Sequence, residues 1–217
     1  MPQSRFVVAL VLVLALAQLG AADAADTRYR LCLDPGHGGS DPGAVYFGLA
    51  EEEVTLDIAR RVAAALDPTF YVVQMTRTGD VKLGNSERAA VCNAFGAQVV
   101  LSIHLNASSD PKVDYVWMFY GKPTKDKAFA ATMDRNYAIS TPDGTGWLVN
   151  KPITNFANGT LLKSNAPAAL AEVLFISNAQ ENALLQQDDP TDPNAPPSRR
   201  QQIANALVKG ITAWTGR

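Results

Sequence analysis

The sequence contains only two histidines, and each comes just after a run of residues that is typical of a buried strand. His37 lies in the segment LDPGHGGSDPG, residues 33–43, and His104 lies in LSIHLNA, residues 101–107. Strand ends are where α/β folds present side chains to a cleft. A catalytic zinc needs three ligands of the His, Glu or Asp type and one open position. We therefore predict a metal centre that includes both histidines.

The third ligand is expected at Glu51, the first of three consecutive glutamates that open a helical pattern over 51–66. The glycines around His37 allow a sharp turn, so a carboxylate in the first turn of this helix can reach back over the strand end. The structural alternative is that all three glutamates only complement the partial positive charge at a helix start.

Glu172 is the one charged residue in the apolar segment 168–176. A carboxylate in an apolar strand costs several kcal/mol unless it is paired, ligated or protonated. Burial also raises the pKa of a carboxyl group, which suits a general base that acts near neutral pH. The structural alternative is an ion pair with a basic residue such as Lys163.

The elements that must position these side chains alternate along the chain. Helical patterns cover 51–66, 85–95, 125–138, 180–187 and 199–214, and strand patterns cover 28–34, 70–76, 98–103, 114–120 and 168–176. This alternation predicts an α/β fold in one domain, with a parallel or mixed sheet that helices cover on both faces. The segment 139–160 is rich in Gly, Pro, Asn and Thr and is predicted to be a loop.

Residues 1–24 have the features of an export signal. Arg5 precedes an apolar stretch over 6–19, and Ala22-x-Ala24 offers a cleavage site. The stretch is shorter than the roughly 20 residues that a spanning helix needs. We expect an exported protein, periplasmic or extracellular, whose mature chain 25–217 has no membrane span; an uncleaved anchor is the alternative.

Cys32 and Cys92 are the only cysteines, and in an exported chain they could form a disulfide. We expect instead two buried apolar thiols, because one lies on a predicted strand and the other on a predicted helix. Tyr115, Trp117 and Phe119 alternate along one strand pattern, which predicts core residues; a sugar-stacking surface is the alternative.

Composition and motifs exclude several other classes of protein. The net charge is −2 and no cluster of Lys and Arg stands out, so we expect neither nucleic acid nor an anionic membrane as a partner. The chain also lacks the Gly-x-Ser-x-Gly turn of serine hydrolases, the phosphate-binding Gly-x-x-x-x-Gly-Lys-Ser/Thr loop and the His-Glu-x-x-His helix of many zinc proteases.

Taken together, these segments resemble the zinc-dependent N-acetylmuramoyl-L-alanine amidases, which hydrolyse peptidoglycan. The resemblance covers about residues 29–215 of the chain. Its motifs are LDPGHGG with DPGA, GLAE with VTLDIA, TR with Asp80, Arg88 with Asn93, LSIHLNA, and PAALAE with FISN.

The resemblance implies one zinc ion held by His37, Glu51 and His104, with Glu172 as the catalytic carboxylate. It also implies a six-stranded sheet, a monomer that binds peptidoglycan or its muropeptide fragments, and substrate contacts by Asn106 and Lys163. The bond that this family cuts joins the lactyl group of N-acetylmuramic acid to L-alanine. Two other readings stay open: a zinc metallopeptidase that acts on free peptides, and an inactive wall-binding module with the same fold.

The chain departs from the family pattern at several positions. The ligand glutamate is usually followed by Lys, whereas Glu52 follows here, so Glu52 is the second choice for the ligand. Lys163 stands where the family usually has Arg, and Leu174 stands where it usually has Gly. Asp34 is a candidate for orienting a ligand imidazole, although an Asp before Pro-Gly more often forms a turn. Because the segment between His104 and Glu172 is short, we expect no occluding regulatory helix there.

Overall fold

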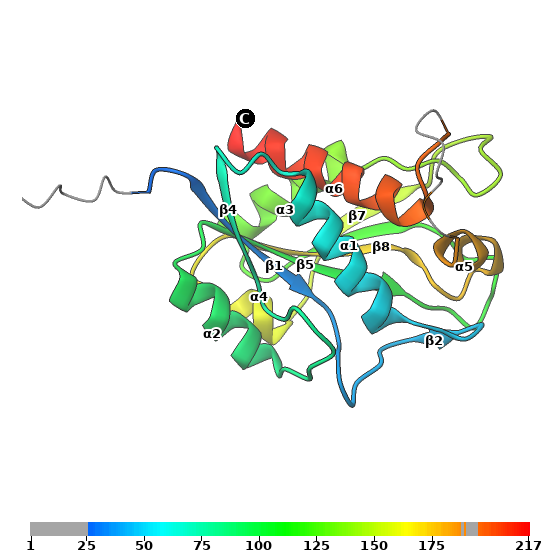
Figure 1. Ribbon diagram of the computed structural model, residues 1–217, viewed down its shortest axis with the longest axis horizontal. Helices are drawn as coiled ribbons and strands as arrows, with labels where there is room; N and C mark the ends of the chain where they lie inside the picture. The colour runs from blue at the N-terminus through cyan, green and yellow to red at the C-terminus, as the bar shows by residue number, and fades with distance from the viewer. Residues whose placement is uncertain (1–25, 188, 190–194) are drawn as a thin grey trace, which may run out of the picture.

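A six-stranded sheet forms the centre of the computed structural model, which describes residues 26–187, 189 and 195–217. The strand order is β4-β1-β5-β8-β6-β7, and all neighbours are parallel except β6 and β8 (Figure 1). The strands are β1 (Tyr29–Pro35), β4 (Tyr71–Met75), β5 (Val99–Asn106), β6 (Val116–Tyr120), β7 (Asn150–Asn155) and β8 (Ala168–Phe175). The predicted α/β class and mixed six-stranded sheet are confirmed. The predicted export signal, residues 1–24, lies outside the described residues.

Helices cover both faces of this sheet. One face is covered by α1 (Glu51–Ala65), α3 (Lys125–Asn136) and α6 (Arg199–Thr215), which enclose the larger apolar core. The other is covered by α2 (Asn85–Phe95) and α4 (Gly159–Lys163), over a smaller cluster that includes Cys32, Val100 and Leu170. The short helix α5 (Ala179–Leu185) packs beside α6 and β8 (Figure 1). The central strands β5 and β8 are buried on both faces, as their continuous apolar runs predict.

Several local predictions were wrong. The segment 139–160 contains strand β7, whose sequence NKPITN carries a proline that lowers its strand signal; an edge strand tolerates this residue. A short hairpin of β2 (Val45–Tyr46) and β3 (Leu49–Ala50) also precedes α1 without a clear sequence signal. Strand β5 continues to Asn106, so His104 lies inside the strand rather than after it.

The two cysteines form a disulfide, so the expectation of unpaired thiols was wrong. Cys32 of β1 and Cys92 of α2 have Cα atoms 5.6 Å apart because α2 packs directly on β1. The sequence could not supply this distance, since 60 residues separate the two positions. The expectation that Tyr115, Trp117 and Phe119 are core residues holds only in part: all three are half-buried, and Phe119 packs against the smaller core cluster.

The elements between His104 and Glu172 are β6, α3, β7 and α4. Helix α3 packs on β6 and β8 with Phe129, Ala130 and Met133, in the core on the face opposite to Glu172. In the described part of the chain, no helix is long and apolar enough to cross a membrane.

Candidate metal centre

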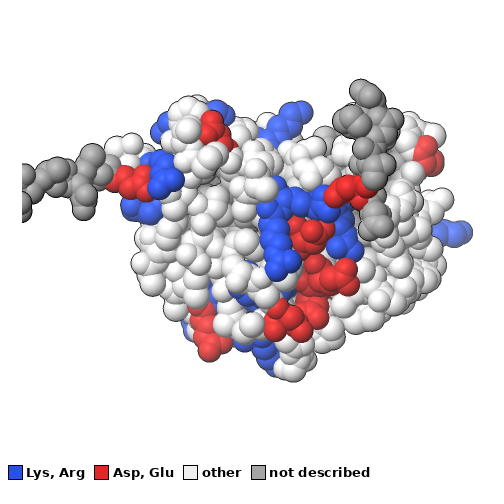
Figure 2. All heavy atoms as spheres, viewed as in Figure 1, with Lys and Arg blue, Asp and Glu red and all other residues white. Residues whose placement is uncertain are grey.

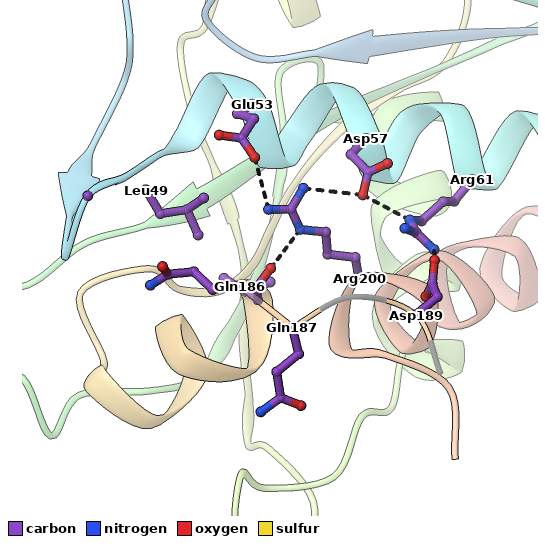
Figure 3. A pocket seen from close by; sticks show the side chains of 10 residues that line it. Leu49, Glu53, Asp57, Arg61, Gln186, Gln187, Asp189 and Arg200 are labelled. Atoms are coloured by element: carbon purple, nitrogen blue, oxygen red, sulfur yellow. Dashed lines mark hydrogen bonds and ion pairs between the residues drawn. The ribbon is translucent and has the colours of Figure 1, made fainter. Parts of the chain in front are cut away.

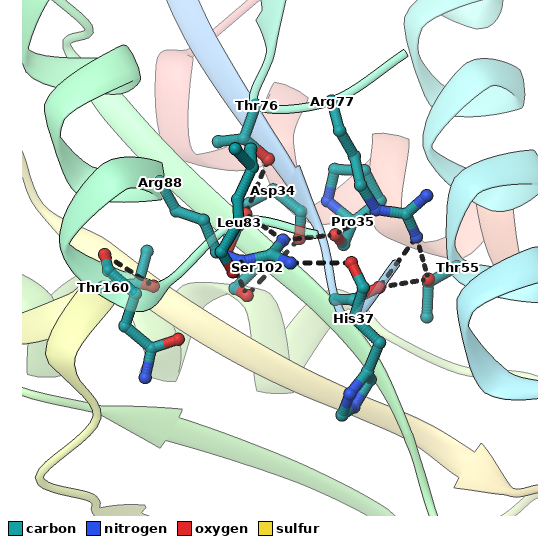
Figure 4. Close-up of polar contacts among 12 residues, drawn as sticks. Asp34, Pro35, His37, Thr55, Thr76, Arg77, Leu83, Arg88, Ser102 and Thr160 are labelled. Atoms are coloured by element: carbon teal, nitrogen blue, oxygen red, sulfur yellow. Dashed lines mark hydrogen bonds and ion pairs between the residues drawn. The ribbon is translucent and has the colours of Figure 1, made fainter. Parts of the chain in front are cut away.

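A tight turn after β1 presents His37. The turn needs left-handed backbone at His37 (φ 60°), where a non-glycine residue is uncommon, and two arginines hold it in place. Arg88 donates to the carbonyl oxygens of Pro35 (2.7 Å) and His37 (2.6 Å), and Arg77 donates to those of Pro35 (3.1 Å) and Gly36 (2.8 Å) (Figure 4). The turn is therefore fixed by buried guanidinium groups rather than by the glycines alone.

Asp34 does not contact an imidazole, so its predicted orienting role was wrong. Its buried carboxylate accepts hydrogen bonds from Thr76 Oγ1 (2.7 Å), Arg88 (3.0 Å) and Ser102 Oγ (2.7 Å). The carboxylate that orients an imidazole is Asp41, whose Oδ1 lies 3.0 Å from His37 Nδ1. Asp34 therefore supports the site indirectly: its carboxylate binds the Arg88 guanidinium, which donates to the carbonyl oxygens of the turn.

The structure brings His37, Glu51 and His104 together. Glu51 Oε1 lies 3.1 Å from His37 Nε2 and 3.0 Å from His104 Nδ1, and one potential ligand atom from each residue lies within 4.8 Å of the others. Backbone N–H groups fix this carboxylate: Leu105 donates to Oε1 and Ala44 donates to Oε2, each at 3.0 Å. Two imidazoles and a carboxylate are a suitable donor set for zinc.

The neighbouring glutamates do not join this cluster. Burial and the nearby Asp80 carboxylate raise the pKa of Glu52, which lies outside the cluster and faces Arg77 and Asp80. Glu53 points the other way, with Oε1 3.1 Å from Arg200. Of the three glutamates, only Glu51 therefore lies in the cluster of potential ligand atoms.

The electrostatics of the cluster favour positive charge between its donors. Burial opposes ionisation of Glu51, yet the hydrogen bonds and charges of both imidazoles hold the pKa of its carboxyl group well below the usual range. Burial likewise opposes protonation of His37, but Glu51 and Asp41 outweigh it and raise the pKa of His37 to about 9. His104 is shifted in the same direction, because Glu51 and Glu172 outweigh its burial. A bound cation would replace these protons.

Two glycines allow the close packing around the donors. A Cβ atom at Gly36 would lie 2.3 Å from His104 Cε1, and one at Gly43 would lie 2.6 Å from Glu51 Oε2. Gly43 also has φ of 67°, which a larger residue rarely adopts. Gly36 and Gly43 are therefore required by contact with the donors, in addition to turn geometry.

Glu172 lies beside this cluster on β8, in lateral register with His104 of β5. Its Oε2 atom is buried and accepts no hydrogen bond within the described residues. Burial raises the pKa of Glu172 to about 7, although the charge of His104 opposes this shift. The structural alternative is not observed: the Lys163 ammonium donates to Ser86 Oγ at 2.6 Å and makes no ion pair with Glu172.

The two residues predicted to contact substrate lie at different places. Asn106 ends β5, two positions after His104, and its Oδ1 accepts from the N–H of Ala107 at 2.8 Å. Lys163 ends α4 and points along α2 toward Ser86. Asn106 therefore lies two residues from His104 on β5, whereas the Lys163 ammonium is hydrogen-bonded to Ser86 of α2.

A hollow lies between α1, α5 and α6, away from the donor cluster, and its charged side chains pair with one another. Arg200 donates to Glu53 (3.1 Å), Asp57 (3.3 Å) and the carbonyl oxygen of Leu185 (2.7 Å), and Arg61 pairs with Asp57 at 2.9 Å (Figure 3). Figure 2 shows acidic and basic side chains interleaved on this face. This is an ion-pair network between helices, in which every charged side chain among the described lining residues has a partner.

Comparison with known proteins agrees with this geometry. Residues 31–213 match the family model described as N-acetylmuramoyl-L-alanine amidase. The germination-specific N-acetylmuramoyl-L-alanine amidase of Bacillus subtilis is 33% identical over 199 residues, covering 84% of this chain and 78% of that protein. AmiC of Neisseria meningitidis is 45% identical over 228 aligned positions, covering 86% of this chain.

Comparison with solved structures indicates the same family. The solved catalytic domain of the amidase CwlV from Paenibacillus polymyxa superimposes with a TM-score of 0.72 at 28% identity, covering 87% of this chain and 98% of that domain. This chain spans 53% of the Neisseria protein, so about half of that relative has no counterpart here. The chain belongs to the N-acetylmuramoyl-L-alanine amidase family.

Sequence reasoning missed the residues that support the donors. Asp41, Arg77 and Arg88 all lie in or near the quoted motifs, yet no role follows from residue type alone. One signal was present for Asp41: it follows His37 by four residues across a glycine-rich turn, a spacing that lets a carboxylate fold back onto the ring.

Proposed function

We propose that this chain hydrolyses the amide bond between N-acetylmuramic acid and L-alanine of peptidoglycan, with one zinc ion held by His37, Glu51 and His104. The observation that carries the proposal is the buried, unpartnered Oε2 atom of Glu172 beside a two-histidine, one-carboxylate donor set. A carboxylate oxygen without a partner is costly in a purely structural role, whereas a general base needs a free lone pair.

The donors fit zinc by their chemistry. Imidazole nitrogen and carboxylate oxygen are common ligands of catalytic zinc, and the support of His37 by Asp41 is of the kind that fixes a ligand ring. When bound, zinc supplies Lewis acidity, which makes a water molecule more acidic and a carbonyl carbon more electrophilic.

The residues of the chain account for the proton transfers. Glu172 accepts a proton from the attacking water and then returns it to the nitrogen of the leaving L-alanine. Its raised pKa suits both steps near neutral pH, since the group can hold and release the proton. Asp41 keeps the ring of His37 oriented while these steps occur. Asn106 and Lys163 are proposed to contact the substrate, Asn106 from the strand end beside the donors.

The cellular setting is also part of the proposal. Intact peptidoglycan lies outside the cytoplasm, and residues 1–24 have the features of an export signal. We propose a monomer that works in the periplasm or outside the cell on peptidoglycan or on its fragments.

Digestion of purified muropeptides tests the proposed reaction. The wild-type protein with zinc should release an intact stem peptide and a saccharide with intact muramic acid, both identified by mass. Cleavage between amino acids would indicate a metallopeptidase, and binding without any cleavage would indicate an inactive wall-binding module. Glu172→Gln is the matched control, because it keeps the shape of the side chain and removes the base.

A further inference from the structure

An aromatic residue continues the row of catalytic side chains across the sheet. Within the register, His104 of β5 pairs with Glu172 of β8, and Glu172 pairs with Trp117 of β6. Directly opposed residues on paired strands project from the same face of a sheet. The indole of Trp117 therefore stands on the same face as the donors, one strand beyond Glu172.

Trp117 belongs to a row of four rings along one side of this face. The ring centroids of Tyr115 and Trp117 are 6.0 Å apart, those of Trp117 and Phe119 are 4.7 Å apart, and those of Phe119 and Phe156 are 5.3 Å apart. Phe156 is 46% exposed, and the other three rings are partly exposed. We call these four residues the aromatic strip.

The strip is partly exposed because the helices on this face lie elsewhere, and only Phe119 packs against the smaller core cluster. Helix α2 packs on β1 and β4, and α4 packs on β8, whereas α3 packs on β6 and β7 from the opposite face. Val116 and Met118 of β6, which point to that opposite face, are fully buried. An exposed aromatic row that is continuous with a catalytic site is a typical ligand surface.

The indole of Trp117 is held in position before any ligand arrives. Its Nε1–H donates to the carbonyl oxygen of Pro152 and to Thr154 Oγ1, both at 3.0 Å. Beside it, the Lys151 ammonium lies 4.8 Å from the centre of the Tyr115 ring. A ring that is already oriented loses little freedom on binding, so its stacking contributes more fully to affinity.

We propose that the aromatic strip binds sugar rings of the glycan strand and so positions the muramic acid whose amide is cut. This inference rests on the proposed function for the source of the sugars. The apolar C–H face of a pyranose stacks on an aromatic face, whose electron density attracts those hydrogens. The strip itself carries no charge, which fits a neutral N-acetylated sugar better than a stem peptide with its carboxylates.

A sugar-only probe tests the strip independently of hydrolysis. The probe is the β-1,4-linked tetramer of N-acetylglucosamine, which contains no muramoyl–peptide amide, and its binding to the full protein is measured by titration calorimetry. Trp117→Ala and Phe156→Ala should each weaken binding by about three- to tenfold, the range for one aromatic contact. Trp147→Ala is the matched control, because Trp147 is 68% exposed beside α6 and outside the strip.

The same variants are then compared on two muropeptides, one with a tetrasaccharide and one with muramic acid alone. Trp117→Ala should lose at least three times more kcat/KM on the long substrate than on the short one. Trp117→Phe, which keeps a ring, should recover most of that loss, and circular dichroism checks that each variant is folded. Unchanged binding of the sugar tetramer in both alanine variants, or equal loss on both muropeptides, would overturn the proposal. Sugar binding without amide cleavage would instead contradict the proposed function alone.

Discussion

Replacing Arg88 with methionine should destabilise the protein and weaken metal binding together. Arg88 is 4% exposed, pairs with the buried Asp34 carboxylate at 3.0 Å, and donates to the carbonyl oxygens of Pro35, His37 and Leu83. Loss of one partner from a buried ion pair costs about 3–5 kcal/mol, because the other charge stays buried. Loss of a supporting contact around a ligand lowers metal affinity by about 10- to 100-fold.

Urea unfolding and zinc titration of the purified variant measure both effects. A matched control is Arg28→Met, which removes an exposed pair with Asp26 and should cost no more than about 1 kcal/mol. Adding Asp34→Asn to Arg88→Met should recover part of the stability, since the buried charge is then removed. A double variant that is no more stable than Arg88→Met, or a single variant with unchanged zinc affinity, would refute the reasoning.

Three further predictions follow from other parts of the structure. Glu172→Gln should lower kcat by about 10²- to 10⁴-fold with zinc content unchanged; activity within tenfold of wild type would remove Glu172 from its role. Burial and the Glu181 carboxylate raise the pKa of Asp114 to about 7. The folded state therefore keeps a proton that the unfolded state has released, and the contribution of Asp114 to stability should fall as pH rises from about 4 to 7. The stability of Asp114→Asn relative to wild type, measured by urea unfolding, should be greater at pH 8 than at pH 5. An equal difference at the two pH values would contradict this. Replacing both Cys32 and Cys92 with alanine should cost about 4 kcal/mol of unfolding free energy, because a loop of 60 residues is no longer closed; an unchanged urea midpoint would argue against the disulfide.

Much of the fold was predictable because its signals are local. Alternating strand and helix patterns correctly indicated an α/β fold with a parallel or mixed sheet, since the central strands β5 and β8 are mostly apolar. Strand β7 was not predicted because it pairs only with β6 at the sheet edge, where burial imposes little hydrophobic pattern on the sequence. The hairpin of β2 and β3 has two residues in each strand, which is too short for any periodicity.

The donor cluster was predictable for a different reason. His37 follows β1, His104 lies within the last three residues of the neighbouring strand β5, and Glu51 begins α1. Parallel topology brings the ends of neighbouring strands together. The disulfide and the exposure of the aromatic strip were not predictable, because they depend on distances between elements far apart in the chain. For Asp41 the only signal was its spacing of four residues from His37. The alternation of Tyr115, Trp117 and Phe119 has the same appearance whether a helix covers that face or not.

Zinc content of the purified protein, measured by elemental mass spectrometry, tests the central claim most directly. The account predicts one zinc per chain in the wild type and in Glu172→Gln, and less than about a tenth of that in His104→Ala, which loses a ligand. Equal zinc content in wild type and His104→Ala, or no zinc in the wild type after exposure to the metal, would contradict it.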